Sequence, residues 1–151
     1  MTKVLVAGVG MTDFYKPGKS PDYTELGRDA ALAAIKDAGI GYRDIEHVYA
    51  GYVFGDSVAG QRAIYPLGLT GVPIFNVTNS CATGSTALFL ARQAILSGQA
   101  ECALAVGFDQ MAPGPILMAY GDRPAPLGRH LEKLAAAGGQ TDGAYLPEFY
   151  G

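Results

Sequence analysis

Short apolar runs alternate along the chain with segments in which apolar residues recur every three or four positions. The runs have strand length, are rich in valine and aromatic residues, and contain few polar positions. That pattern is typical of strands buried on both faces. Four strands are therefore predicted, over residues 3–9, 46–54, 73–78 and 102–107.

The segments between the runs carry the helical period. Residues 22–38 place Leu26, Ala30 and Ala33 on one face, and Gly39 follows as a helix stop. Further helices are predicted over 61–69, where Pro66 interrupts the pattern, over 82–97, which Gly98 closes, and over 131–137. The regular alternation of strand and helix predicts an α/β fold with a mostly parallel, covered sheet.

The composition changes after Gly107. Residues 113–130 contain four prolines and scattered charges, and GGQTDG follows at 138–143. The last residues, 145–151, are aromatic and apolar, whereas chain ends are usually polar. Two interpretations stay open: these side chains fold back onto the sheet, or the chain is one piece of a larger structure.

Composition and charge exclude several classes of protein. The 151 residues are 49% hydrophobic and 17% charged, which excludes a disordered chain. No apolar stretch reaches the roughly 18 residues of a membrane span, so no integral membrane contact is expected. The net charge of −3 makes nucleic acid an unsuitable partner. Two cysteines form no disulfide framework, and residues 1–10 do not resemble a signal peptide, so we expect a reducing, cytoplasmic location.

Cys81 is the strongest candidate for chemistry. It lies in N-S-C-A-T-G-S, between the predicted strand 73–78 and the predicted helix 82–97. A thiol at a helix N-terminus is close to unpaired N–H groups and the positive end of the helix dipole, which stabilise a thiolate. The position resembles the strand–turn–helix elbow that carries nucleophiles in other α/β folds. The alternative is a small cysteine that only packs.

The other reactive residue types carry weaker signals. Cys102 lies in the middle of a predicted core strand and is interpreted as a buried apolar residue. His47 and His130 have no cysteine or carboxylate set at metal-ligand spacing, so no metal site is predicted. The glycines of GVGMTDF (8–14) do not form a dinucleotide fingerprint, because Asp13 stands where that pattern needs a glycine.

Four segments together resemble a known family. They are GVGMTDF (8–14), GYVFGDSVAGQRAIY (51–65), NVTNSCATGSTALFLARQAI (76–95) and AECALAVGFDQM (100–111). In order and spacing they are similar to the thiolase domain of the sterol carrier protein X group, within the thiolase superfamily. The resemblance covers the whole chain, more loosely from residue 113 onward, and EFYG (148–151) also matches a family segment.

The resemblance implies a fold and an activity. Thiolases have two similar half-domains, each a five-stranded mixed sheet with helices on both faces, and a loop domain inserted into the first half. By this resemblance, residues 1–112 correspond to the N-terminal half-domain and 113–151 to the beginning of the loop domain. The family cleaves or forms a carbon–carbon bond in 3-oxoacyl-CoA, with coenzyme A as substrate and no other cofactor. Cys81 falls at the nucleophile position, and dimers or tetramers are expected, with strand 73–78 near the dimer axis.

The family's histidine motifs, second cysteine and oxyanion-hole glycine belong to its second half-domain, and none of those motifs occurs in this sequence. The chain alone is therefore expected to be inactive and to need a complementary segment or chain. Arg123, Arg129 and Lys133 are candidate contacts for the phosphates of coenzyme A, and Phe149 and Tyr150 for an acyl chain.

Three functions stay open at this stage. The first is a thiolase acting on fatty or sterol side-chain 3-oxoacyl-CoA through an acyl-cysteine. The second is a thiolase-fold retro-aldolase of steroid side-chain degradation, which need not use the cysteine. The third is a non-enzymatic subunit for acyl-CoA binding or assembly.

Overall fold

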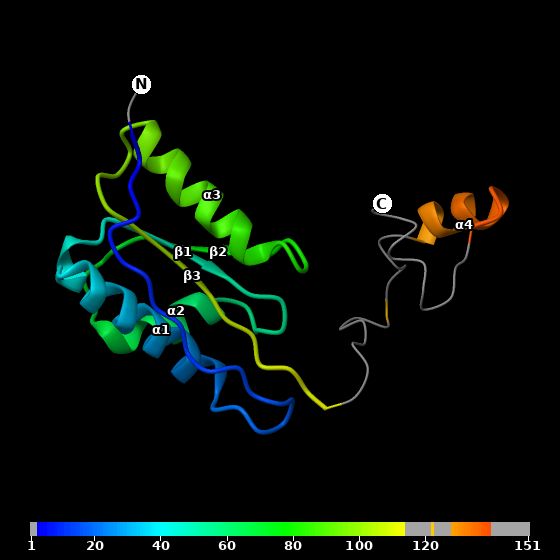
Figure 1. Ribbon diagram of the computed structural model, residues 1–151, viewed down its shortest axis with the longest axis horizontal. Coiled ribbons are helices and arrows are strands. Elements are labelled where there is room, and N and C mark those ends of the chain that lie inside the picture. The colour runs from blue at the N-terminus through cyan, green and yellow to red at the C-terminus, as the bar shows by residue number, and fades with distance from the viewer. Residues whose placement is uncertain (1–2, 114–121, 123–127, 140–151) are drawn as a thin grey trace. The chain divides into compact units, whose positions relative to one another are not determined.

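The computed structural model describes residues 3–113, 122 and 128–139 (Figure 1). The chain divides into two compact units, Met1–Pro115 and Ile116–Gly151, which are treated separately below. In the second unit the described residues contain one helix, α4 (Gly128–Ala136). All other helices and strands of the described residues belong to the first unit.

The first unit is built on a parallel sheet of three strands. β1 (His47–Gly51) lies between β2 (Ile74–Val77) and β3 (Ala103–Gly107). Gly51, the last residue of β1, pairs with Val77 on one side and Gly107 on the other. The carboxyl ends of all three strands therefore meet at one edge of the sheet, where ligand sites of open α/β folds are formed.

Helices cover both faces of this sheet (Figure 1). α1 (Tyr23–Ala38) and α2 (Ala59–Ile64) pack on one face, against Val48, Leu104 and Val106. α3 (Thr83–Leu96) packs on the other face, through a row of alanines against Tyr49 and Val77. Alternate strand residues thus face opposite helix layers, as expected for a sheet buried on both sides. The result confirms the α/β fold expected from the sequence.

The ends of α1 follow from its capping residues. The Asp22 carboxylate accepts hydrogen bonds from the Thr24 N–H at 2.9 Å and the Thr24 hydroxyl at 2.6 Å. The hydrogen bonds from Thr24 lower the pKa of Asp22 below its usual value. At the other end Gly39 has φ 68°, a left-handed conformation that glycine adopts without strain. The helix predicted over 22–38 is therefore confirmed, together with its stop.

Most other predicted elements are present with different bounds. The helix predicted over 61–69 is α2 followed by a 3-10 turn, η2 (Tyr65–Leu67), because Pro66 prevents the helix from continuing. The helix predicted over 131–137 begins three residues earlier, as α4. Strands predicted over 46–54, 73–78 and 102–107 are β1, β2 and β3, and the helix predicted over 82–97 is α3.

The strand predicted over residues 3–9 is wrong for this structure. The segment has no strand assignment, and Leu5, Val6 and Val9 are 80%, 75% and 69% exposed. Its composition suits a strand, but none of the described strands pairs with it. The described residues thus form three strands, whereas the sequence pattern predicted four and the family resemblance implied five.

Candidate active site

Cys81 lies in a tight turn between the end of β2 and the start of α3. Three residues separate it from Val77, and Thr83 begins the helix two residues later. Its side chain is exposed. Ser80, directly before it, has φ 46°, a left-handed conformation that is uncommon for a non-glycine residue. The turn presents the thiol at the carboxyl edge of the sheet, as predicted from the strand–turn–helix pattern.

A buried threonine holds this turn together. Thr83 is 4% exposed, and its hydroxyl accepts a hydrogen bond from the Asn79 N–H and donates one to the Ser80 carbonyl, both at 2.7 Å. The Ala82 N–H also donates to the Asn79 carbonyl at 3.0 Å. Because these bonds bracket Cys81 on both sides, they fix the backbone from which its side chain projects.

The Asn79 side chain forms a second layer of bonds around the turn. Its amide nitrogen donates to the Thr86 hydroxyl at 2.9 Å, and that hydroxyl donates to the Ala82 carbonyl at 2.9 Å. Asn79, Thr83 and Thr86 are the residues that sequence reasoning did not single out. The feature of the sequence that indicates them is the T-G-S-T run at a helix start, because threonine and serine side chains there often form hydrogen bonds with the backbone.

The N-terminus of α3 offers free backbone donors beside Cys81. Among the described residues, the N–H groups of Gly84 and Ser85 have no hydrogen-bond acceptor. Ala82, at the N-cap position, supplies no side-chain bond to the helix. Such unpaired N–H groups and the helix dipole favour a negative charge, here a thiolate or a bound anion.

Glycines let α3 approach the ends of the strands. A Cβ atom on Gly51 would lie 2.8 Å from the Thr83 Cγ2 and 3.0 Å from the Thr83 carbonyl oxygen. A Cβ atom on Gly107 would be 3.7 Å from the Gly84 Cα, an ordinary contact. Gly51 is thus required by the close packing of the Thr83 turn against β1, and this packing places Cys81 near the end of the central strand.

Polar side chains form hydrogen bonds with the loops that follow the strands at the carboxyl edge of the sheet. The Asp109 carboxylate, after β3, accepts hydrogen bonds from the Val53 and Phe54 N–H groups at 2.9 and 2.8 Å. On β2, the Asn76 amide accepts from the Gly60 N–H at 2.9 Å and donates to Gln61 at 2.8 Å. These bonds hold the loop after β1 in place on two sides.

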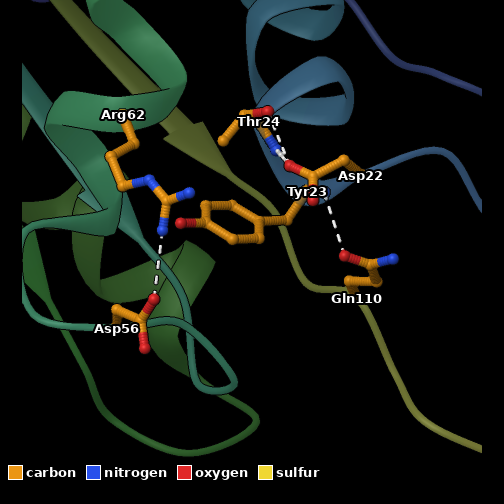
Figure 2. Close-up of polar contacts among 6 residues, drawn as sticks. All are labelled: Asp22, Tyr23, Thr24, Asp56, Arg62 and Gln110. Carbon is orange, nitrogen blue, oxygen red and sulfur yellow. Dashed lines mark hydrogen bonds and ion pairs between the residues drawn. The ribbon is translucent and has the colours of Figure 1, made fainter.

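An aromatic and charged cluster fixes the start of α1 to these loops. Figure 2 shows Arg62 of α2 beside the Tyr23 ring, with its guanidinium 5.5 Å from the ring centroid and 3.0 Å from Asp56. The Tyr23 N–H donates to Gln110 at 3.2 Å, and its ring stacks on Phe108. Burial raises the pKa of Tyr23 above its usual value. The cluster is a packing feature, and it contains no group placed to act on Cys81.

The second cysteine has a different environment. Cys102 precedes β3, at the opposite end of the sheet from Cys81, and is only partly exposed. Burial raises the pKa of the Cys102 thiol, and the nearby carboxylates of Glu46 and Asp44 raise it further. A protonated, partly buried thiol is a poor nucleophile.

His47 does not form a pair with Cys81. His47 begins β1, four residues before the end of the sheet at which Cys81 lies, and four strand residues span roughly 13 Å. Its Nδ1 lies 3.2 Å from the Tyr49 hydroxyl, and its ring packs against Phe75. His130 belongs to α4, in the second unit.

The candidate phosphate contacts lie partly on α4. Arg129, His130 and Lys133 line a cavity of about 280 Å³, within one turn of each other. Arg123, Phe149 and Tyr150, the other candidates for substrate contact, lie outside the described residues.

No cluster of three potential metal ligands occurs among the residues that the structure describes. No described helix is both long and apolar enough to cross a membrane.

Comparison with known proteins identifies the family. The sequence model described as "Thiolase, N-terminal domain" matches residues 4–135, most of the chain. The chain therefore belongs to the thiolase family, as the sequence motifs indicated.

Known relatives are much longer than the part of them that this chain matches. "Sterol carrier protein 2" of Homo sapiens is 48% identical over 154 residues, covering 100% of this chain and 28% of that protein. "Non-specific lipid-transfer protein-like 2" of Caenorhabditis elegans is 40% identical over 154 residues, covering 99% of this chain and 37% of that protein. Among solved structures, 3-oxoacyl-[acyl-carrier-protein] synthase III of Aquifex aeolicus is similar with a TM-score of 0.49 at 22% identity, over 56% of this chain and 29% of that chain.

Proposed function

We propose that this chain carries the nucleophilic cysteine of a thiolase, and that Cys81 accepts the acyl group of a 3-oxoacyl-CoA. The observation that carries the proposal is the exposed thiol in a turn fixed by Thr83, beside free N–H donors of α3. Membership of the thiolase family supports acyl transfer as the reaction class.

In the proposed reaction the Cys81 sulfur attacks the 3-keto carbon of the substrate. The bond between carbons 2 and 3 then breaks, and its electron pair forms the enolate of an acyl-CoA, which takes up a proton and leaves. The remaining acyl group stays on Cys81 as a thioester. The thiol of coenzyme A attacks that thioester, loses its proton, and restores the cysteine, so that coenzyme A is a substrate.

Two proton transfers in this scheme need a general acid and a general base. Within the described residues of the first unit, the one histidine is His47, at the far end of the sheet. We therefore propose that further polypeptide, in cis or in a second chain, supplies these groups. The chain spans about 28% of the mammalian relatives it matches, which leaves ample length for them in those proteins.

The substrate class is proposed from the relatives. Their names refer to sterol carriage and lipid transfer, which supports a fatty or sterol side-chain acyl group. The unpaired thiols, Cys81 and Cys102, support a reducing compartment such as the cytoplasm.

The test is reconstitution of activity. The 151-residue chain is fused to the C-terminal remainder of the human relative, and thiolysis of acetoacetyl-CoA and of a longer 3-oxoacyl-CoA is measured. We expect turnover by the fusion and none by the chain alone. Cys81→Ala should abolish turnover, whereas Cys102→Ala should leave it within about twofold, since Cys102 lies at the other end of the sheet.

Each other outcome identifies a different function. Carbon–carbon cleavage that survives Cys81→Ala would move the assignment to the retro-aldolase type. A folded fusion that binds acyl-CoA without turnover would indicate the non-enzymatic subunit. Either result contradicts the proposed acyl-cysteine.

A further inference from the structure

The N-terminus of α3 is not capped in the usual way. A usual N-cap residue is extended, and its side chain accepts a hydrogen bond from the second or third N–H of the helix. Ala82, which occupies this position, has φ −91° and ψ 8° and forms no side-chain bond. The N–H groups of Gly84 and Ser85 thus have no acceptor among the described residues. Other bonds must therefore hold the first turn of the helix.

Two side chains, Asn79 and Thr86, supply such bonds and are referred to here as the Asn79/Thr86 pair. The Asn79 amide nitrogen donates to the Thr86 hydroxyl at 2.9 Å, and this hydroxyl donates to the Ala82 carbonyl, also at 2.9 Å. The Thr86 N–H donates to the same carbonyl at 2.9 Å. The pair thus joins the segment before Cys81 to the first turn of α3, and it uses none of the free N–H groups of the helix.

The Asn79/Thr86 pair acts on a different part of the structure from Thr83. The Thr83 hydroxyl bonds backbone atoms of Asn79 and Ser80, within the turn itself. The pair extends to Thr86, almost one helical turn beyond Thr83, so it fixes the turn relative to the helix. Ser80 has φ 46°, a conformation that costs free energy and persists only where surrounding bonds impose it. The pair adds one of the bonds that impose it.

We propose that Asn79 and Thr86 are positioning residues for Cys81. Their bonds hold the thiol beside the free N–H groups of α3, where a negative charge on the sulfur, or on a group bound to it, is stabilised by these donors and by the helix dipole. The inference deepens the proposed acyl transfer, on which its meaning for catalysis rests. The placement of the thiol is a property of this chain and is measurable without turnover.

The experiment compares two alkylating reagents, iodoacetate and iodoacetamide, on the folded 151-residue chain. With both reagents the Cys81 sulfur forms a bond to carbon, iodide leaves and the thiol proton passes to the buffer, so the reagents differ only in a carboxylate or an amide. Free N–H groups beside the sulfur attract the carboxylate. We expect the ratio of the iodoacetate rate to the iodoacetamide rate to be about two- to fivefold higher in the folded chain than in urea. Low ionic strength is used, because salt screens the attraction.

Matched variants test the role of the pair. Thr86→Val keeps the shape of the side chain but removes the hydroxyl, so the rate ratio should fall to its value in urea, whereas Thr86→Ser should retain it. Asn79→Leu removes only the donor, at an exposed position that the fold tolerates, and should lower the ratio in the same way. Thr78→Val is the control. Thr78 is exposed in the same segment and has no recorded side-chain bond among the described residues, so the ratio should stay unchanged.

Turnover by the fusion protein separates this inference from the proposed function. If the fusion is inactive but the rate ratio depends on the pair, the positioning stands and the acyl-transfer assignment fails. If the fusion is active but Thr86→Val changes neither the ratio nor kcat, the assignment stands and the positioning fails. Where both hold, Thr86→Val should lower kcat and leave KM within about twofold, because the pair acts on the reacting sulfur and not on substrate contacts.

Three results of the labelling experiment would overturn the proposal. The first is a rate ratio at Cys81 that is equal in the folded chain and in urea, because the thiol would then not lie beside the donors. The second is a ratio that neither Thr86→Val nor Asn79→Leu lowers in a folded variant, because the pair would then contribute to stability alone. The third is a ratio that Thr78→Val lowers as much, because any change in the segment would then disturb the thiol.

Discussion

At the level of single residues, the two cysteines differ in exposure and surroundings. Cys81 is exposed at a helix start, and Cys102 is partly buried near two carboxylates that raise its pKa. We predict that iodoacetamide modifies Cys81 first, as measured by peptide mass mapping over time. Because a raised pKa shifts thiolate formation to higher pH, labelling of Cys102 should become fast only above the ordinary thiol value of 9.0.

Equal labelling rates of the two cysteines would contradict this prediction. If Cys102 is labelled as fast as Cys81 near neutral pH in the folded chain, the exposed turn gives no reactivity advantage. Labelling in urea serves as the control, because unfolding should make the two rates similar.

Thr83 is the residue on which the geometry of the Cys81 turn depends. Thr83→Val keeps the shape of the side chain but leaves the Asn79 N–H and the Ser80 carbonyl without their partner. We expect a loss of about 1–3 kcal/mol in the free energy of unfolding, measured by urea titration. The Cys81 labelling rate should also change, because the turn loses its fixed conformation.

Thr83→Ser is the matched control for that variant. Serine retains the hydroxyl, so the labelling rate of Cys81 should return close to that of the unmodified chain. If Thr83→Val and Thr83→Ser label Cys81 equally, the hydroxyl does not position the turn.

At the level of elements, the packing of α3 on β1 depends on a glycine. Gly51→Ala would bring a methyl group within 3.0 Å of the Thr83 backbone, so α3 or β1 must shift. We expect destabilisation of about 1–3 kcal/mol, the usual cost of overpacking. Gly84→Ala is the matched control: no atom lies within 4 Å of the new methyl group, and it should stabilise the helix by about 0.4–1 kcal/mol. Equal unfolding midpoints for the two variants would contradict this packing.

The elements also show what a sequence pattern can and cannot predict. α1 was predicted almost to the residue, because its period and the Gly39 stop are local signals. The Cys81 turn was located for the same reason. The state of residues 3–9 was not predictable from their apolar pattern, since a strand forms only when a neighbour pairs with it. The Thr83 and Asn79 bonds depend on three-dimensional contacts that no spacing rule reveals.

At the scale of the whole molecule, the first unit has two open strand edges, β2 on one side and β3 on the other. Parallel sheets are usually covered on both faces and protected at their edges. The faces here are covered by α1, α2 and α3, but the edges of the described sheet are not. The Cys81 turn is therefore held by hydrogen bonds within the first unit, whereas the two outer strands of the described sheet each have one edge without a strand partner.

The open edge at β2 leads to a prediction about association. Phe75 on β2 is 43% exposed and stacks on Tyr49, so it extends the apolar surface of the sheet beyond its last strand. We predict that the mass of the chain measured by sedimentation exceeds the monomer mass of 15.7 kDa, and increases with concentration.

Phe75→Lys places a charge at this edge, which natural sheets use to prevent pairing, and should return the chain to the monomer mass. Leu32→Lys on α1, at a similar exposure of 46%, should leave association unchanged. A chain that sediments at 15.7 kDa at every concentration and unfolds cooperatively would contradict the prediction, because both edges would then be stable in water without a partner.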